Sequence, residues 1–140
     1  MLPKRTLISF FFSLPILLIL SSCTVNQSPT IIITNAQIAG NIDEKLMPIQ
    51  QTDTFPSETT KVFCWFEWEN AKIGTKIIAH WHFITDDIPI LNYEFTIPRK
   101  NGHGSVSFAM PEGKRLPEGL YKIDLSIGKT ILKTLKFTVE

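Results

Sequence analysis

The alternation of apolar and polar residues from Lys61 to the end of the chain is the feature that most constrains the fold. Successive side chains of an extended strand point to opposite faces, so a period of two predicts strands that each bury one face. A helix would show a period of about 3.6 residues, and this region has no stretch of that kind. The alternation therefore predicts an all-β domain.

Turn residues divide the alternating region into separate strands. The interruptions are Asp86-Asp87, the cluster 101–104, the Pro- and Gly-bearing loop 111–119 and Gly128-Lys129, all of which are typical of turns and loops. The predicted strands run over 61–70, 76–83, 91–97, 105–110, 121–125 and 135–139, and an earlier one over 30–39 contains a β-branched isoleucine cluster. The total is about seven short strands. Residues 40–60 are mixed and polar, so we expect a long irregular connection with room for one short strand over 46–49.

The same period assigns a face to each side chain. The predicted core faces carry Val62, Cys64, Phe66 and Trp68 on one strand, Ile77, Ala79, Trp81 and Phe83 on the next, and Leu91, Tyr93, Phe95 and Ile97 on the third. Phe63 and Trp65 then lie on the opposite face of the first strand. His80 and His82 lie on the opposite face of the second.

The N-terminal segment has the composition of a secretory signal. Its apolar run, residues 7–20, has 14 residues, whereas a membrane-spanning helix needs about 20. Lys4 and Arg5 precede the run and Pro15 interrupts it, and a basic start before a short apolar run is typical of a signal peptide. We therefore divide the chain into a signal peptide over 1–22, a tether over 23–30 and one β-domain over 31–140.

The residues Leu20-Ser21-Ser22-Cys23 resemble the lipobox of bacterial lipoproteins. In that family a diacylglyceryl group is attached to the cysteine sulfur, cleavage makes the cysteine the new N-terminus, and in many species its amine is acylated too. The resemblance implies lipid attachment at Cys23, with chains such as palmitate anchoring the protein. Thr24 rather than Asp follows, which in the enterobacterial pattern implies the outer membrane. The alternative is a signal peptide cut elsewhere, with an incidental cysteine.

The charge balance of the mature chain argues against two classes of partner. Without Lys4 and Arg5, 12 basic residues stand against 13 acidic residues, a formal net charge of −1. A nucleic-acid groove and a polybasic membrane patch both need clustered positive charge, so neither is expected. If Cys23 carries lipid, Cys64 has no disulfide partner in the chain, and the domain is expected to be stabilised by core burial alone.

The segment Leu116-Pro117-Glu118-Gly119-Leu120-Tyr121 resembles the tyrosine corner of immunoglobulin-like domains. Cys64, Trp81 and Ile123 resemble the central pin of those domains, with a thiol and an aliphatic side chain in place of the disulfide. Residues 63–139 as a whole resemble the immunoglobulin-like modules of exported bacterial proteins. These resemblances imply an immunoglobulin-like antiparallel β-sandwich. Their motifs are fold motifs, so they imply no catalytic residues.

Candidate chemistry is sparse along the chain. His80 and His82 leave the same face of one strand and could share a metal ion, with His103 as a third ligand; solvated histidines opposite a buried Trp81 explain them as well. Cys64 is either a redox thiol or a small buried hydrophobe. The chain has no Gly-x-Ser-x-Gly motif and no phosphate-binding glycine loop. We therefore expect no catalytic residue, no cofactor and no enzyme.

Phe63 and Trp65 are the candidate binding surface. Large apolar side chains on an outward face often mark a partner site. The alternative is that the 40–60 connection, a second sheet or a flanking strand covers them.

The sequence predicts an envelope lipoprotein on the outer membrane with a non-catalytic binding or structural role and an envelope protein as partner. The alternative is an exported inhibitor or accessory subunit that docks through sandwich-end loops such as 111–119 or 101–104. A third class is periplasmic metal handling through His80 and His82.

Overall fold

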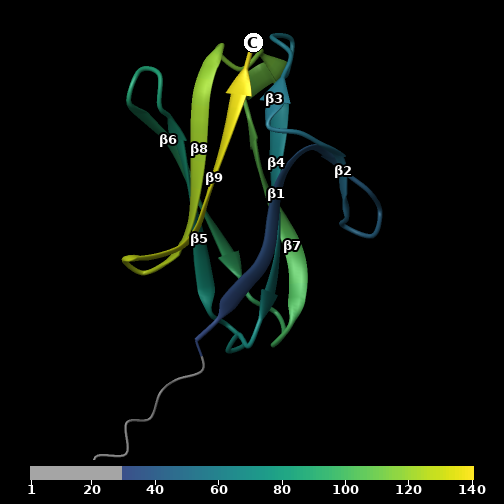
Figure 1. Cartoon of the computed structure of the whole chain (residues 1–140), viewed down its shortest axis with the longest axis vertical. Helices are drawn as coiled ribbons and strands as arrows, with labels where there is room; N and C mark the ends of the chain where they lie inside the picture. Colours follow the sequence, from purple (N-terminus) through teal and green to yellow (C-terminus); the bar gives the residue numbers. More distant parts are fainter. Residues whose placement is uncertain (1–29) are drawn as a thin grey trace, which may run out of the picture.

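A computed structural model describes residues 30–140, which form two β-sheets packed face to face (Figure 1). The predicted signal peptide and Cys23 lie outside the described residues. Within residues 30–140, no helix is long and apolar enough to cross a membrane.

The four-stranded sheet has the order β2-β1-β4-β7 and the five-stranded sheet the order β3-β9-β8-β5-β6. The first sheet consists of β1 (Ile32–Ile42), β2 (Pro48–Gln51), β4 (Lys61–Glu69) and β7 (Gly102–Ala109). The second consists of β3 (Thr54–Phe55), β5 (Lys76–Phe83), β6 (Ile88–Thr96), β8 (Gly119–Ile127) and β9 (Thr130–Val139). A single 3₁₀ turn, η1 (Pro111–Gly113), lies between β7 and β8. All pairs are antiparallel except β3 with β9.

The predicted fold class is confirmed: the domain is all-β, and the seven predicted strands correspond to β1 and β4 to β9. The 40–60 segment is less irregular than expected, because it contributes β2 and β3. These strands are short and pair with β1 and β9. Strands of four and two residues are too short to show a clear period in the sequence.

The predicted turn at 101–104 is mostly strand, because β7 begins at Gly102. A Cβ atom at Gly104 would lie 2.6 Å from the ring of Phe95, and one at Gly102 would lie 3.0 Å from the indole of Trp68. The two glycines therefore allow bulky aromatic rings to lie against the strand. The sequence pattern indicated a turn at these two glycines, but in the structure they lie in or at the start of β7 and allow close packing.

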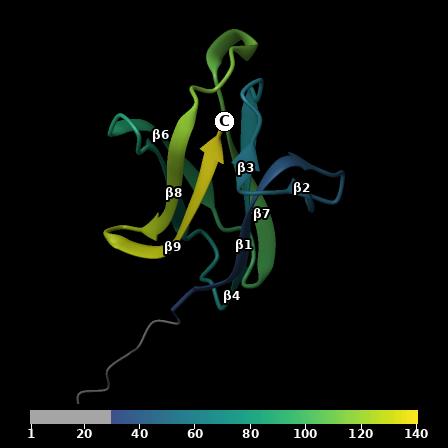
Figure 2. The same cartoon turned by 45° about the horizontal axis from the view of Figure 1, so that its top comes forward.

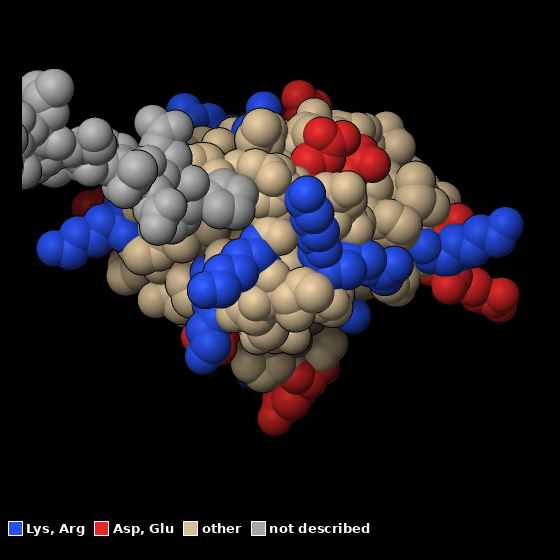
Figure 3. All heavy atoms as spheres, turned by 90° about the horizontal axis from the view of Figure 1, so that it is seen from below, with Lys and Arg blue, Asp and Glu red and all other residues tan. Residues whose placement is uncertain are grey.

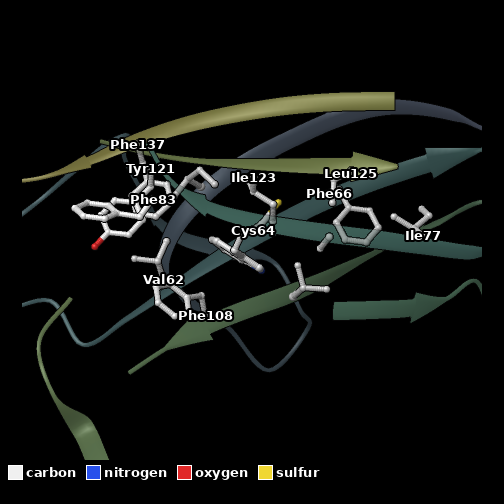
Figure 4. Close-up of a cluster of buried hydrophobic side chains, with 14 of the residues drawn as sticks. Val62, Cys64, Phe66, Ile77, Phe83, Phe108, Tyr121, Ile123, Leu125 and Phe137 are labelled. Carbon is white, nitrogen blue, oxygen red and sulfur yellow. The ribbon is translucent and has the colours of Figure 1, made fainter. Parts of the chain in front are cut away.

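The core lies between the sheets and is built from the predicted alternate residues (Figure 4). Its largest fully buried side chains are Trp68, Trp81, Tyr121, Phe66, Phe137, Ile77, Ile97, Leu116, Ile123, Leu125, Val62 and Val139. Cys64 and Ile123 are fully buried and Trp81 nearly so, and all three belong to one core cluster, in which Figure 4 labels Cys64 and Ile123. The three residues of the predicted pin therefore all lie in the core, with a thiol and an aliphatic side chain among them.

The predicted core face of β6 is wrong at two positions. Leu91 and Tyr93 are 41% and 48% exposed. β6 is the edge of the five-stranded sheet, and the four-stranded sheet opposite it ends at β7. Phe95 and Ile97 on this face do reach the core: Ile97 is fully buried, and the ring centroid of Phe95 lies 5.2 Å from that of Phe66. An alternating pattern predicts a face but does not show whether anything covers that face.

Candidate functional site

Trp65 is not a binding surface, because it is only 3% exposed. It lies on the outer face of β4, opposite Gln37 of β1 in the strand register. The ring of His103 on β7 packs on it at a centroid distance of 5.9 Å. His103 Nε2 lies 3.2 Å from the carbonyl oxygen of Lys45, which brings the connection between β1 and β2 over this face. Of the two interpretations of Trp65, an exposed binding surface or a covered strand face, the structure favours the second, and the 40–60 segment and the β7 strand provide the cover.

Phe63 has a different environment, because it is half-buried and lines an open groove. The Lys61 ammonium lies 4.7 Å from the centre of its ring, in the arrangement of a cation–π contact. The groove runs between the end of β1, the β2–β3 segment and the start of β4. Its lining consists of Gly40, Asn41, Gln50, Thr52, Phe55, Pro56, Glu58, Thr59, Thr60, Lys61 and Phe63.

The wall of this groove contains a strained residue. Gln50 has a φ of 57°, a left-handed conformation that a non-glycine residue adopts rarely. Strained backbone of this kind concentrates at binding sites, where the surrounding structure holds it in place. The groove therefore brings together two aromatic rings, Phe55 and Phe63, one ammonium group, one carboxylate and several hydroxyl and amide groups. Such a set suits binding, since a few oriented polar groups beside an apolar surface give specificity.

The three histidines do not come together. His80 and His82 lie on β5 in the five-stranded sheet, while His103 lies on β7 in the other sheet and faces Trp65. His82 Nε2 is 2.9 Å from Asp87 Oδ1. Among residues 30–140 no group of three or more His, Cys, Asp or Glu side chains could hold a metal ion. His103 is thus excluded as a third ligand with the other two.

His80 belongs instead to a chain of hydrogen bonds across β6, β5 and β8. Its Nδ1 is 2.8 Å from Asn92 Oδ1 and its Nε2 is 2.9 Å from Ser126 Oγ. The order serine, histidine, amide matches that of some catalytic triads. Ser126, however, is only 2% exposed, so its hydroxyl is not accessible to a substrate. The two hydrogen bonds of His80 are better explained as side-chain contacts that stabilise the pairing of three neighbouring strands.

Cys64 is a free thiol at the centre of the core. Burial raises the pKa of the Cys64 thiol to about 12, because the charged thiolate loses its water. At neutral pH the group is therefore protonated and a poor nucleophile. Of the two interpretations of this cysteine, the structure favours the small hydrophobe.

The two candidate docking loops lie at opposite ends of the sandwich. Residues 110–118 connect β7 to β8 near the C-terminus, and most of their side chains are exposed while Leu116 is buried. Only Asn101 of the cluster 101–104 is outside a strand.

The sequence indicated Phe63 but not the groove that it lines, because the far wall of the groove comes from the polar 50–60 segment. The sequence feature that could have indicated the groove is Lys61, which precedes Phe63 by two residues and lies on the same outward face of the strand.

Comparisons with known proteins show the fold and no more. No protein-family model and no curated protein sequence matches the chain. Among solved structures, an immunoglobulin-like protein of Pseudomonas aeruginosa aligns with a TM-score of 0.57 and 14% sequence identity, covering 81% of this chain and 99% of that one. Part of the DNA-bound alkylpurine DNA glycosylase AlkC of Pseudomonas fluorescens aligns with a TM-score of 0.46 and 10% identity, covering 79% of this chain and 30% of that one. The first match supports the immunoglobulin-like architecture, and the second is too weak for any argument.

Proposed function

We propose that the protein is an exported, lipid-anchored binding domain that holds an envelope protein close to the outer membrane and catalyses no reaction. The observation that carries the proposal is the position of the Phe63 groove. Phe63 lies near the start of β4, whereas Thr30, where the described chain begins, lies at the opposite end of the sandwich (Figure 1). An anchor at Cys23 would therefore leave the groove pointing away from the membrane.

The sequence before the domain supports an anchor of short reach. Cys23 follows a lipobox-like triplet, and residues 24–29 separate it from Thr30. An extended segment of about seven residues reaches roughly 25 Å at most. Acyl chains on Cys23 would hold the domain firmly, at about 0.8 kcal/mol per buried methylene. The domain would thus work within reach of the membrane face.

The chemistry of the groove supports a protein partner. Aromatic side chains with a nearby cation are frequent among the residues that dominate binding energies. Phe63 keeps part of its ring accessible, and Lys61 is exposed beside it. A partner that presents an apolar side chain next to a carboxylate would fit both.

Two measurements test this proposal. Mass spectrometry of the mature protein should find acyl groups on Cys23, and an unmodified cysteine would contradict the anchor. Crosslinking in the native envelope should then capture one partner, and Phe63→Ala should reduce its yield at least tenfold. Tyr93→Ala is the matched control, because Tyr93 is an exposed aromatic residue away from the groove; equal loss in both variants would contradict a role for the groove.

A second candidate is docking through the loop 110–118. This loop is fixed by the buried Leu116 and by the hydrogen bond from the Tyr121 hydroxyl to the Pro117 carbonyl, so it presents Glu112, Lys114 and Arg115 in a stable arrangement. An inhibitor or accessory subunit would use such a loop. Replacing residues 112–115 by a short glycine–serine turn should then abolish the complex that Phe63→Ala leaves intact. The opposite result favours the groove.

A further inference from the structure

The end of the sandwich from which the chain emerges collects basic residues. We call it the tether end and define it by Thr30, the connections 70–75 and 97–101, and the β8–β9 turn at 128–129. The connections contain four basic residues and no acidic residue: Lys72, Arg99, Lys100 and Lys129. All four are exposed, and none of them forms an ion pair within residues 30–140. Figure 3 looks at this end and shows several blue side chains on it, together with a few red ones.

Carboxylates are few around this surface. Glu67 and Glu69 lie near the end of β4, and Glu94 lies near the end of β6 with its carboxylate 2.9 Å from the Lys76 ammonium. These three carboxylates are outnumbered by Lys76 and the four basic residues of the connections. The excess of positive charge is therefore not cancelled by its neighbours. The net charge of the whole chain does not indicate this group of basic residues, because three connections far apart in the sequence bring their charges to one end.

The basic residues are held in a rigid frame. Ala71 N donates a hydrogen bond to the Lys100 carbonyl and Gly74 N to the Ile97 carbonyl, each at 2.9 Å. Trp68 Nε1 donates to the Arg99 carbonyl, also at 2.9 Å. The two connections thus run side by side and keep Lys72, Arg99 and Lys100 at fixed positions.

Two further features point to a membrane at this end. Asn70 Nδ2 donates to the Thr30 carbonyl at 3.3 Å, so the chain that leads to Cys23 leaves from the middle of the basic connections. Ile73, between Lys72 and Gly74, is 68% exposed and is the most exposed large apolar side chain of the described residues. An apolar side chain flanked by basic residues matches the chemistry of a bilayer interface, which is anionic outside and apolar below.

We propose that the tether end is a docking surface for an anionic phospholipid bilayer, with its basic residues against lipid phosphates and Ile73 in the headgroup layer. The docking rests on the proposed lipid anchor, which would hold this end at the membrane. It deepens that function by fixing the orientation of the domain. The Phe63 groove would then face away from the bilayer whenever the domain is docked.

The test uses the mature lipoprotein in vesicles of phosphatidylcholine, alone or mixed with phosphatidylglycerol. A polarity-sensitive dye is attached to Pro98→Cys at the tether end or to Glu58→Cys at the opposite end, both exposed positions. Cys64 does not compete for the dye, because it is buried and its thiol stays protonated. The dye at 98 should report an apolar surrounding only in vesicles with phosphatidylglycerol, and less so as salt screens the charges. The dye at 58 should not respond.

Neutralising the basic residues should undo this docking. Each basic residue near an anionic surface changes the ratio of docked to free domain about fivefold, so Lys72→Gln with Lys100→Gln should lower that ratio roughly 25-fold. Lys114→Gln with Arg115→Gln, an exposed basic pair at the other end, is the matched control and should change nothing. A dye response that does not depend on lipid charge would overturn the proposal, and so would equal effects of the two double variants.

Sedimentation with pure phosphatidylcholine vesicles tests the lipid anchor independently of the docking surface. Failure to sediment there would contradict the lipid anchor of the proposed function. Binding to phosphatidylglycerol vesicles by such an unanchored protein, lost in the Lys72 and Lys100 variant, would still support the docking surface.

Discussion

The two ends of the sandwich are closed in the same way but carry opposite charge. At the tether end the Trp68 indole donates to the Arg99 carbonyl, and at the opposite end the Tyr121 hydroxyl donates to the Pro117 carbonyl. Each bond joins a large core ring to a loop. We call the opposite end the distal end; Figure 2 brings it forward, with its connections around the C-terminus.

The connections of the distal end are mainly acidic. Residues 56–60, 84–87 and 110–118 together with Glu140 contribute Glu58, Asp86, Asp87, Glu112, Glu118 and Glu140, against two basic residues, Lys114 and Arg115. The tether end has only basic residues in its connections. Exposed charges contribute little to stability, so the fold requires the two aromatic closures but not this separation of charge. The difference in charge between the ends therefore favours the proposed docking: the basic tether end would be attracted to an anionic surface, and the acidic distal end would be repelled by it.

The largest expected effect of a single substitution comes from removing the closure of the tether end. Trp68→Ala should lower the free energy of unfolding by about 3–5 kcal/mol, because it empties a buried site of indole size and leaves the Arg99 carbonyl without its donor. Urea unfolding followed by fluorescence measures this loss. Ile73→Ala at the same end should change stability by no more than about 0.5 kcal/mol, and a loss below about 1 kcal/mol for Trp68→Ala would show that the closure matters little.

Alkaline pH should separate the two closures, since an indole does not titrate and a phenol does. Burial raises the pKa of Cys64 from 9.0 to about 12 and that of Tyr121 from 10.0 to about 12. Above these ordinary values the unfolded chain releases protons that the folded chain keeps. The contribution of these two groups to the free energy of unfolding should therefore be constant below pH 9 and fall between pH 9 and about 12, by up to about 1.4 kcal/mol per pH unit for each group.

Urea unfolding at increasing pH measures this slope. Cys64→Ala should remove the part that begins near pH 9, and Tyr121→Phe should remove the part that begins near pH 10. An identical slope in the wild type and in both variants would contradict the assignment.

A smaller effect is expected from the distal hydroxyl alone. Tyr121→Phe keeps the buried ring but removes the donor to Pro117, which should lower stability by about 1–2 kcal/mol. Tyr93→Phe is the control, because Tyr93 is exposed and its hydroxyl has no hydrogen-bond partner among the described residues. Equal changes in the two variants would mean that the hydrogen bond from Tyr121 to the Pro117 carbonyl does not contribute to the free energy of unfolding at neutral pH.

The smallest effect on stability is expected from the charges. Lys72→Gln with Lys100→Gln and the matched pair Lys114→Gln with Arg115→Gln should each change the free energy of unfolding by less than about 0.5 kcal/mol. The same variants should differ strongly in docking to anionic vesicles. A large loss of stability in the tether-end pair would mean that those charges serve the fold, which would remove the distinction between the two ends.

Much of the fold could be predicted because the period of two is a local property. Val62, Cys64, Phe66 and Trp68 lie in the core as the alternation indicated, and the Tyr121 corner forms as its motif implied. The errors at Leu91 and Tyr93 have a single cause. Whether a face is covered depends on the width of the opposite sheet, which no residue of β6 encodes.

The candidate site was only partly predictable. Phe63 lines the groove, but Trp65, two residues further along the same face, is buried by His103 and the β1–β2 connection. His80 and His82 do share a face, as the period requires, yet each ring is engaged with its own partner. Partners of this kind come from distant strands, so the pattern along one strand could not identify them.

The sequence by itself determined the strands, the composition of the core and the lipobox-like start, because each depends on neighbouring residues. The tertiary structure alone decided that Trp65 is covered, that Phe63 borders a groove, and that a nearly neutral chain has a basic end and an acidic end. The physical reason is the same for all three. Antiparallel strands reverse direction at every turn, so connections far apart in the sequence meet at one end and combine charges and surfaces that the linear order keeps separate.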